Sequence, residues 1–227
     1  MSTSQDLGQS SEDYLKAIYT LGQETAGVVN TNQLAQALGV SAAAATKAIQ
    51  HLADKELIIY KPYYGASLTE LGQRAAVRMV RLHRLLELFL HDVLGYSWDE
   101  VDVEAERLEH HVSALMESRI DAYLNYPTID PHGDPIPSSD GVVIPRKGKA
   151  LAECEMNDKV EVLRVSDRSS EVLQYLDTLE LRPGVELQVV DKKPFDGPLT
   201  VTVGGESHVL GRNVAGYVFV KELVTTI

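Results

Sequence analysis

The stretch that decides the fold of this chain is TNQLAQALGVSAAAATKAIQHLADK, residues 31–55. Apolar residues recur at helical spacing on both sides of Gly39-Val40-Ser41. A glycine ends helices readily, and a serine is a preferred N-cap for the helix that follows. Two short helices joined by such a turn are typical of a helix-turn-helix. The sequence therefore predicts this motif in the first third of the chain.

The second helix of the pair has small and polar side chains on its expected outer face. The run of alanines, Ala42–Ala45, leaves that face unusually bare, so that it can approach base edges closely. Hydroxyl, amide and ammonium groups beside the alanines can bond to bases and phosphates. We therefore expect DNA contacts from Ser41, Ala43, Ala44, Thr46, Lys47 and Gln50. The alternative is a helical hairpin that only packs.

Elements on either side of this motif extend it. Residues 57–60 and 66–68 read as two strands, which add a wing whose Lys61, Tyr63 and Tyr64 can reach phosphates or a minor groove. A helix over 12–22 is expected upstream, capped by Ser10 or Ser11, and a long helix runs from just after Thr69 to about Leu94.

A second informative stretch, Asp102 to His111, predicts an amphipathic helix that ends near Leu115. Its apolar stripe comprises Val101, Ala105, Leu108, Val112 and Leu115, and its opposite side comprises Asp102, Glu106, Glu109 and His110. Carboxylates at this spacing repel one another unless a cation lies between them. The face is either a solvated acidic surface or part of a metal site, and the metal reading requires ligands from elsewhere in the chain.

Candidate partners for such a site exist upstream. His83 and Glu87 stand at i and i+4 on the long helix, a spacing that is also usual for a surface salt bridge, and Asp13 lies at the start of the first helix. Imidazole and carboxylate ligands without a thiolate suit Mn²⁺ or Fe²⁺ better than structural Zn²⁺.

Composition limits the class of protein. The formal net charge is −12, and residues 82–146 alone carry thirteen Asp and Glu against four Lys and Arg. This balance opposes DNA binding, which draws its affinity from Lys and Arg. Cys154 is the only cysteine, so an intrachain disulfide is excluded, and we treat it as a small buried residue. Because no signal peptide and no run of ~20 apolar residues is found, we expect a cytoplasmic protein without a membrane contact.

The last third of the chain has a different pattern. Residues 127–147 are rich in proline and read as a linker. Short β segments follow at 159–165, 185–190, 200–203 and 217–220, with a helical turn or two over 170–179. The fold class is therefore mainly α with a small β barrel, and we expect domains at 1–73 (winged helix-turn-helix), 74–146 (helical) and 147–227 (SH3-like barrel).

Several motifs in this order resemble the diphtheria toxin repressor family, the iron- and manganese-dependent transcription regulators. They are Glu12-Asp13-Tyr14-Leu15, the winged helix, Arg81-Leu82-His83-Arg84-Leu85-Leu86-Glu87, Glu106-x-x-Glu109-His110 and Pro131-His132-Gly133-x-Pro135-Ile136-Pro137. The resemblance covers nearly the whole chain. It implies a homodimer that binds a palindromic operator in double-stranded DNA when a divalent metal is bound, most simply as a repressor.

The resemblance also implies two ligand sets. The first is Asp13, Glu106, Glu109 and His110; the second is His83 and Glu87 with groups outside the middle domain. For those groups it suggests Asp130, where manganese-type relatives have a cysteine, and Asp167 or Glu171 from the C-terminal domain. Asp102 is a lesser candidate, and His132 is expected to fix its loop instead of binding metal.

Two departures from the family pattern bear on the choice of metal. Iron-type members have Met and Cys where this chain has Asp13 and Glu106, and carboxylates in place of sulfur favour Mn²⁺ over Fe²⁺. Lys16 replaces a glutamate of small manganese-type members, so their two-metal cluster need not form here. We expect Mn²⁺, with Fe²⁺ as the alternative. An organic-ligand sensor and a metal-dependent hydrolase are the rival functions, and we expect no enzyme because no general base accompanies the carboxylates.

Overall fold

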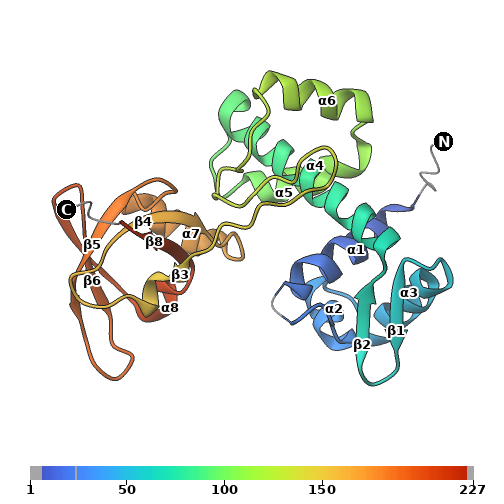
Figure 1. Cartoon of the computed structure of the whole chain (residues 1–227), viewed down its shortest axis with the longest axis horizontal. Coiled ribbons are helices and arrows are strands. Elements are labelled where there is room, and N and C mark those ends of the chain that lie inside the picture. The colour runs from blue at the N-terminus through green and yellow to red at the C-terminus, as the bar shows by residue number, and fades with distance from the viewer. Residues whose placement is uncertain (1–6, 24, 224–227) are drawn as a thin grey trace. The chain divides into compact units, whose positions relative to one another are not determined.

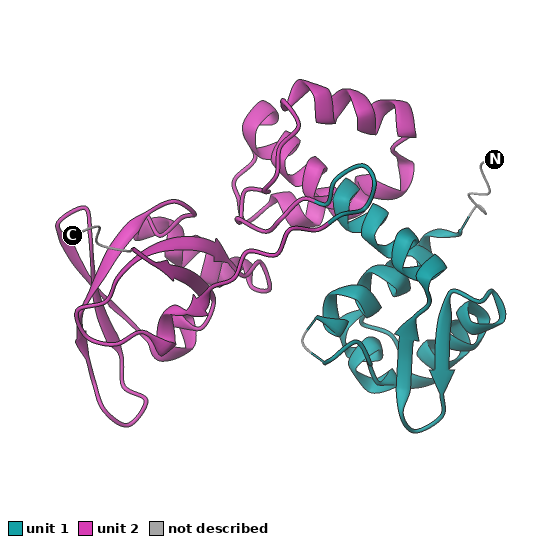
Figure 2. Cartoon of the chain, in the orientation of Figure 1, with its two compact units in different colours: residues 1–82, 137–142 teal, residues 83–136, 143–227 magenta. Residues whose placement is uncertain are grey.

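A computed structural model describes residues 7–23 and 25–223 of the chain, which forms two compact units (Figure 2). The N-terminal unit extends to Leu82 and includes Pro137–Val142, and the C-terminal unit comprises His83–Ile136 and the chain from Val143 onward. The boundary between the units falls within one long helix, α4 (Glu70–Leu94). The expected domain boundaries at residues 73 and 146 stay predictions.

The N-terminal unit is a winged helix-turn-helix, as the sequence predicts (Figure 1). It is built from α1 (Gln9–Gly22), α2 (Thr31–Ala37), α3 (Ala42–Asp54) and the antiparallel strands β1 (Ile58–Lys61) and β2 (Gly65–Leu68). Ser41 caps α3 by accepting a hydrogen bond from the Ala44 amide. The expected cap of the first helix is wrong: α1 begins at Gln9 with Gly8 as N-cap, so both serines lie inside its first turn.

The wing is fixed to the rest of this unit by backbone pairing. Val29 exchanges two hydrogen bonds with Ala66 of β2, at 2.9 and 2.8 Å. The neighbouring Gly65 has a φ of +127°, and a Cβ at this position would lie 2.6 Å from the Val29 carbonyl oxygen. Glycine is therefore required where the wing crosses this segment.

The C-terminal unit begins with the second half of α4, α5 (Val101–Leu108), a 3₁₀ turn over Glu109–His111 and α6 (Ala114–Tyr123). The prediction of one helix from Val101 to about Leu115 is wrong, because α5 ends at Leu108. A 3₁₀ turn has about three residues per turn, so it rotates the side chains that follow away from the α-helical stripe. As a result Glu109 is 2% exposed instead of lying on a solvated face, and Leu115 is 67% exposed.

The proline-rich segment is held in place by arginines. Arg84 of α4 donates to the Pro135 carbonyl oxygen at 2.6 Å. Arg146 donates to the carbonyl oxygens of Gly133 and Leu163, at 2.9 and 2.7 Å. The part of this segment up to Ile136 is therefore a fixed turn, which positions the side chains on it.

The last part of the C-terminal unit is a small antiparallel sheet domain, in agreement with the predicted fold class. Its strands are β3 (Lys149–Ala150), β4 (Lys159–Val165), β5 (Glu186–Lys192), β6 (Leu199–Val203), β7 (Glu206–Leu210) and β8 (Val218–Glu222), in the order β3-β8-β4-β5-β6-β7. Helices α7 (Ser170–Thr178) and α8 (Arg212–Ala215) and a 3₁₀ turn, Leu151–Glu153, accompany the sheet. Neither β3 nor β7 was predicted from the sequence.

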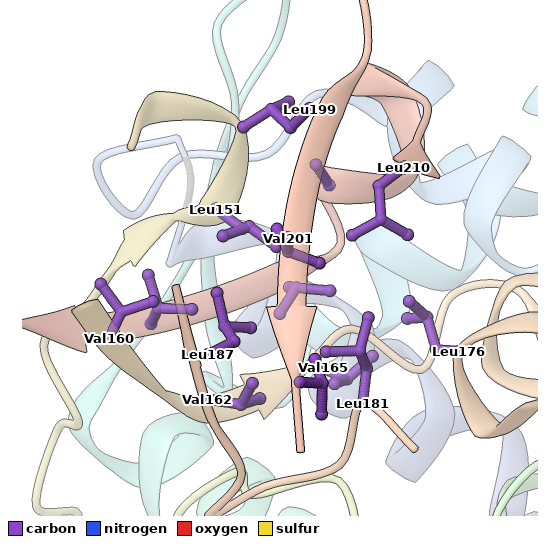
Figure 3. Close-up of a cluster of buried hydrophobic side chains, with 14 of the residues drawn as sticks. Leu151, Val160, Val162, Val165, Leu176, Leu181, Leu187, Leu199, Val201 and Leu210 are labelled. Carbon is purple, nitrogen blue, oxygen red and sulfur yellow. The ribbon is translucent and has the colours of Figure 1, made fainter. Parts of the chain in front are cut away.

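One hydrophobic core stabilises this sheet domain. Alternate residues of the strands, such as Val160, Val162 and Val201, are buried in one cluster that also includes Leu176 of α7 (Figure 3). Cys154 belongs to the same core and is buried, as expected. Within the part of the chain that the structure describes, no helix is long and apolar enough to cross a bilayer.

Candidate metal centre and DNA-binding surface

The candidate metal centre begins on α4 of the C-terminal unit. His83 and Glu87 lie one helical turn apart, and both are buried, with relative exposures of 8% and 1%. The Nε2 atom of His83 is 3.5 Å from Oε1 of Glu87. An imidazole and a carboxylate buried together at this depth are unlike the exposed salt bridge that the spacing alone also allows.

Helix α5 and the turn after it supply carboxylates to the same imidazole. Asp102 Oδ1 lies 3.3 Å from His83 Nε2, and Glu106 Oε2 lies 3.7 Å from His83 Nδ1. Glu109 Oε2 is 2.6 Å from His83 Nδ1. A carboxylate only accepts hydrogen bonds, so Nδ1 carries the proton and Nε2 is left facing Glu87 and Asp102. The structure thus brings these predicted residues together around His83.

A third contribution comes from the proline-rich turn and the sheet domain. His132 is fully buried, and its Nδ1 lies 3.6 Å from Glu87 Oε1. Asp167, on the segment between β4 and α7, offers a carboxylate oxygen within 4.8 Å of ligand atoms of both residues. Glu87, His132 and Asp167 therefore form one group from three parts of the unit.

Two atoms of this group are buried without a hydrogen-bond partner. They are Glu87 Oε1 and His132 Nδ1, which face each other across the 3.6 Å gap. A buried polar atom without a partner costs about 1–3 kcal/mol, so native structures keep few of them. A cation between the two atoms would satisfy both, because a carboxylate oxygen and an imidazole nitrogen are both metal ligands.

The charge state of Glu87 suits such a role. Burial acts to raise the pKa of its carboxyl, but the positive charges of His83 and His132 in their protonated forms, with a hydrogen bond from His83, outweigh burial, and the pKa lies below its ordinary value. Glu87 is therefore an ionised carboxylate in the interior. Burial of an ionised carboxylate is costly unless a cation or hydrogen-bond donors compensate for the lost water.

Two other predicted ligands lie outside these groups. Asp130 is buried, but its Oδ1 accepts from the amides of His132 and Asp134, both at 2.9 Å, and its Oδ2 lies 3.4 Å from Arg84. Its carboxylate thus fixes the turn that carries His132. Glu171 is exposed in the first turn of α7. Among the described residues, neither joins a group of ligand-type side chains, whereas Asp167 does.

The first predicted ligand set is divided between the units. Glu109 and His110 are neighbours in the 3₁₀ turn, with His110 Nε2 3.8 Å from Glu109 Oε1. Asp13 lies in the first half of α1, in the N-terminal unit. Its association with Glu106, Glu109 and His110 stays a prediction.

The sequence predicts that His132 fixes its loop instead of binding metal. The side chain does anchor the turn, because its Nε2 lies 2.6 Å from the Trp98 carbonyl oxygen. Its other nitrogen nevertheless faces Glu87. The signal that could have revealed this is the position of His132 between two prolines in a turn that resembles a family motif, since a rigid turn gives an imidazole a defined direction.

The predicted DNA-binding face of α3 is accessible. Ala43, Ala44, Lys47 and Gln50 are exposed, whereas Ala45 is fully buried and packs in the core of the unit. Thr46 is half-buried, and its hydroxyl donates to the Ala42 carbonyl oxygen at 2.8 Å. The exposed face therefore consists of small residues flanked by a lysine and a glutamine.

The wing is equally accessible. Lys61, Tyr63 and Tyr64 are exposed at the turn between β1 and β2. Tyr63 has a φ of +68°, a conformation that is uncommon for residues with a side chain. The turn thus holds two aromatic rings and a cation in solvent.

Comparison with known proteins covers almost the entire chain. The model of the iron dependent repressor N-terminal DNA binding domain matches residues 6–66, and that of the iron dependent repressor metal binding and dimerisation domain matches residues 69–138. The FeoA domain model matches residues 149–222.

Individual relatives agree with these matches. The diphtheria toxin repressor of Corynebacterium diphtheriae is 27% identical over 96% of this chain and 99% of its own length. The transcriptional regulator MntR of Bacillus subtilis is 36% identical over 52% of this chain and 81% of its own. A solved manganese-dependent transcriptional repressor in complex with manganese is 40% identical, covers 94% of this chain and 100% of its own, and has a TM-score of 0.88.

Proposed function

We propose that Mn²⁺ is the co-effector of this chain, which belongs to the diphtheria toxin repressor family of iron- and manganese-dependent repressors. As a member of this family, the chain is a metal-dependent DNA-binding regulator. The family accounts for three partners: operator DNA, a second copy of the chain and a divalent metal ion. The observation that carries the metal proposal is the buried pair of Glu87 Oε1 and His132 Nδ1, 3.6 Å apart and without hydrogen-bond partners.

The chemistry of the ligand atoms supports Mn²⁺. The clusters of candidate ligands around His83, Glu87 and His132 contain only imidazole nitrogens and carboxylate oxygens. The sole cysteine of the sequence lies in the core of the sheet domain. Hard oxygen ligands suit Mn²⁺ better than softer metals that seek thiolates. The solved relative that binds manganese is 40% identical to this chain. Fe²⁺ remains the alternative, since iron-dependent relatives are also similar.

We propose two ligand sets. The first comprises Asp13, Glu106, Glu109 and His110, and the second comprises His83, Glu87, His132 and Asp167, with Asp102 at its edge. A bound divalent cation supplies the positive charge that these carboxylates need. Asp130 holds the turn, and Glu171 has no part in the proposal. In the first set Asp13 comes from the N-terminal unit, so that metal binding favours one placement of the DNA-binding elements among many.

DNA binding is proposed for α3 and the wing. In a helix-turn-helix the second helix enters the major groove, and the small residues Ala43 and Ala44 allow it to approach the bases. Lys47 and Gln50 then contact phosphates and base edges, and Lys61 with the wing tyrosines contacts the backbone. In a homodimer two such helices read the halves of a palindrome.

The dimer contact is proposed for α6. Its Leu115, Met116 and Tyr123 are exposed, with relative exposures of 67%, 49% and 69%. The helix lies within the region that matches the dimerisation domain. Large exposed apolar side chains within a region that matches a dimerisation domain favour a protein–protein interface. We place the protein in the cytoplasm with its DNA, and we propose no enzymatic reaction for its carboxylates.

The double variant Glu106→Ala, His110→Ala tests this function. Titration of the purified chain with Mn²⁺ gives the number of bound ions, and a duplex selected from random DNA in the presence of Mn²⁺ reports binding. We expect the variant to remain dimeric and to lose the metal-stimulated DNA binding of the parent chain. DNA binding that still responds to Mn²⁺ in the variant would overturn the proposed first set.

A further inference from the structure

Trp98 lies in an unexpected place for its position in the sequence. It belongs to the connection between α4 and α5, yet its indole is 3% exposed within the hydrophobic core of the sheet domain. The next residue strengthens this attachment, because the Asp99 carboxylate accepts a hydrogen bond from the side-chain amide of Gln174 in α7 at 2.6 Å. The guanidinium of Arg182 lies 5.9 Å from the centre of the indole. The helical part thus inserts a side chain into the sheet domain.

The same residue contacts His132 in two ways. The two rings stack, with centroids 5.8 Å apart and an interplanar angle of 28°. In addition, the Trp98 carbonyl oxygen lies 2.6 Å from His132 Nε2. Trp98 is therefore a neighbour of His132 through both its side chain and its backbone, although Trp98 itself offers no metal ligand.

The short contact places a proton on Nε2 of His132. A carbonyl oxygen only accepts hydrogen bonds, so Nε2 must be the donor and Nδ1 of the neutral ring has the free lone pair. That lone pair belongs to the buried atom without a hydrogen-bond partner, which faces Glu87. Metal-ligating histidines generally donate their other nitrogen to a carbonyl or carboxylate, which fixes the tautomer and the direction of the ring.

We propose that Trp98 is a positioning residue for His132. Its indole, fixed in the core of the sheet domain, holds its own carbonyl group on Nε2 and stacks on the imidazole, so that His132 presents Nδ1 to Glu87 and Asp167 before any metal binds. The value of this arrangement to metal binding rests on the proposed second ligand set. The tautomer itself is a property of the metal-free chain.

The test uses full-length metal-free protein labelled with ¹⁵N at histidine, near pH 8. The ring nitrogens of neutral histidine have well separated ¹⁵N shifts according to protonation, and the His132→Gln variant identifies the His132 signals. We expect the Nε2–H form in the parent chain and in Trp98→Phe, which keeps an aromatic ring. Trp98→Ala should give averaged tautomers, and Trp98→Leu carries the same comparison if the alanine variant fails to fold.

Val201→Ala is the matched control, because Val201 lies in the same core. It lowers the stability of the sheet domain without changing the residue beside His132, and we expect the parent tautomer. The proposal is overturned if the parent chain holds His132 as the Nδ1–H form, if the Trp98→Leu and Trp98→Ala spectra equal that of the parent, or if Val201→Ala shifts the tautomer as they do.

A second measurement separates this proposal from the proposed function. Calorimetric titration with Mn²⁺ should show about tenfold or greater weakening at one site in Trp98→Leu, the usual range for loss of such a supporting contact. In a His132→Gln background the same change should cause no further weakening. If the tautomer behaves as expected but Mn²⁺ does not bind the parent chain, the second ligand set fails and the role of Trp98 in orienting the ring stands.

Discussion

Glu109 and His83 connect the two proposed ligand sets. Glu109 Oε2 accepts a hydrogen bond from His83 Nδ1 at 2.6 Å, while its Oε1 lies 3.8 Å from Nε2 of His110. His83 Nε2 in turn lies 3.5 Å from Glu87. One buried carboxylate therefore belongs to the first set and orients a ligand of the second.

This relationship predicts different outcomes for two adjacent residues. Glu109→Ala should weaken Mn²⁺ binding at both sites by about 10- to 100-fold, because it removes a ligand from one set and the hydrogen-bond acceptor of His83 from the other. His110→Ala should weaken only one site. Calorimetric titration of both variants checks the difference, and equal loss in the two variants would mean that the sets are not connected through Glu109.

His132 provides the second prediction. His132→Gln should remove one Mn²⁺ site, because it removes a proposed imidazole ligand and leaves His83 as the only imidazole beside the buried Glu87. His91→Gln is the control: this histidine is partly exposed and paired with Asp92 at 2.7 Å. We expect its metal stoichiometry to equal that of the parent chain. If His132→Gln binds as many Mn²⁺ ions as the parent chain, His132 is not a metal ligand and only fixes its loop.

Much of the N-terminal unit could be predicted because its signals are local. Ser41 is followed by a helix that it caps, Gly39 stands at the turn, and the long helix after Thr69 has a strong apolar period. Strand β7 was missed although Gly204-Gly205 stands before it. Both glycines have positive φ, at +58° and +94°, and two such residues are typical of a hairpin turn.

The site could be predicted only in part, because tertiary contacts decide the rest. Glu109 lies in a 3₁₀ turn because α5 ends at Leu108, and no glycine, proline or other helix-ending residue at this point in the sequence predicts that end. The burial of His132 depends on Trp98, far from it in sequence, and on Arg84, which pairs with the Asp130 carboxylate. Residue types and spacing indicated His83 and Glu87 as candidate ligands, whereas distances within the fold group Asp167, and not Glu171, with Glu87 and His132.

Lys47 carries the third prediction. Lys47→Ala should weaken binding to all DNA sequences alike and lower the slope of log affinity against log salt by about one, as expected for loss of one phosphate contact. Lys193→Ala is the control, because Lys193 lies in the sheet domain, next to β5. A variant of Lys47 that keeps the parent slope would place α3 away from the DNA backbone.

Cys154 carries a fourth prediction, on reactivity. Burial raises the pKa of its thiol to about 11, so the folded chain should react with a thiol reagent at pH 8 far more slowly than the unfolded chain. The thiol pKa is higher in the folded chain than in the unfolded chain, where it is about 8.5. The contribution of this thiol to the free energy of unfolding is therefore complete below about pH 8.5 and is lost as the pH rises toward about 11. Reaction rates in buffer and in denaturant check this, and equal rates would show that the thiol is accessible.

The most direct test of the central claim is the affinity of the full chain for its selected duplex, measured at fixed salt with Mn²⁺, Fe²⁺ or Zn²⁺ and with a chelator. We expect strong binding with Mn²⁺, weaker binding with Zn²⁺ and loss of specific binding with the chelator. Stronger binding with Fe²⁺ than with Mn²⁺ would identify Fe²⁺ as the co-effector and leave the mechanism unchanged. The same affinity with the chelator as with Mn²⁺ would contradict the claim that metal binding controls DNA binding.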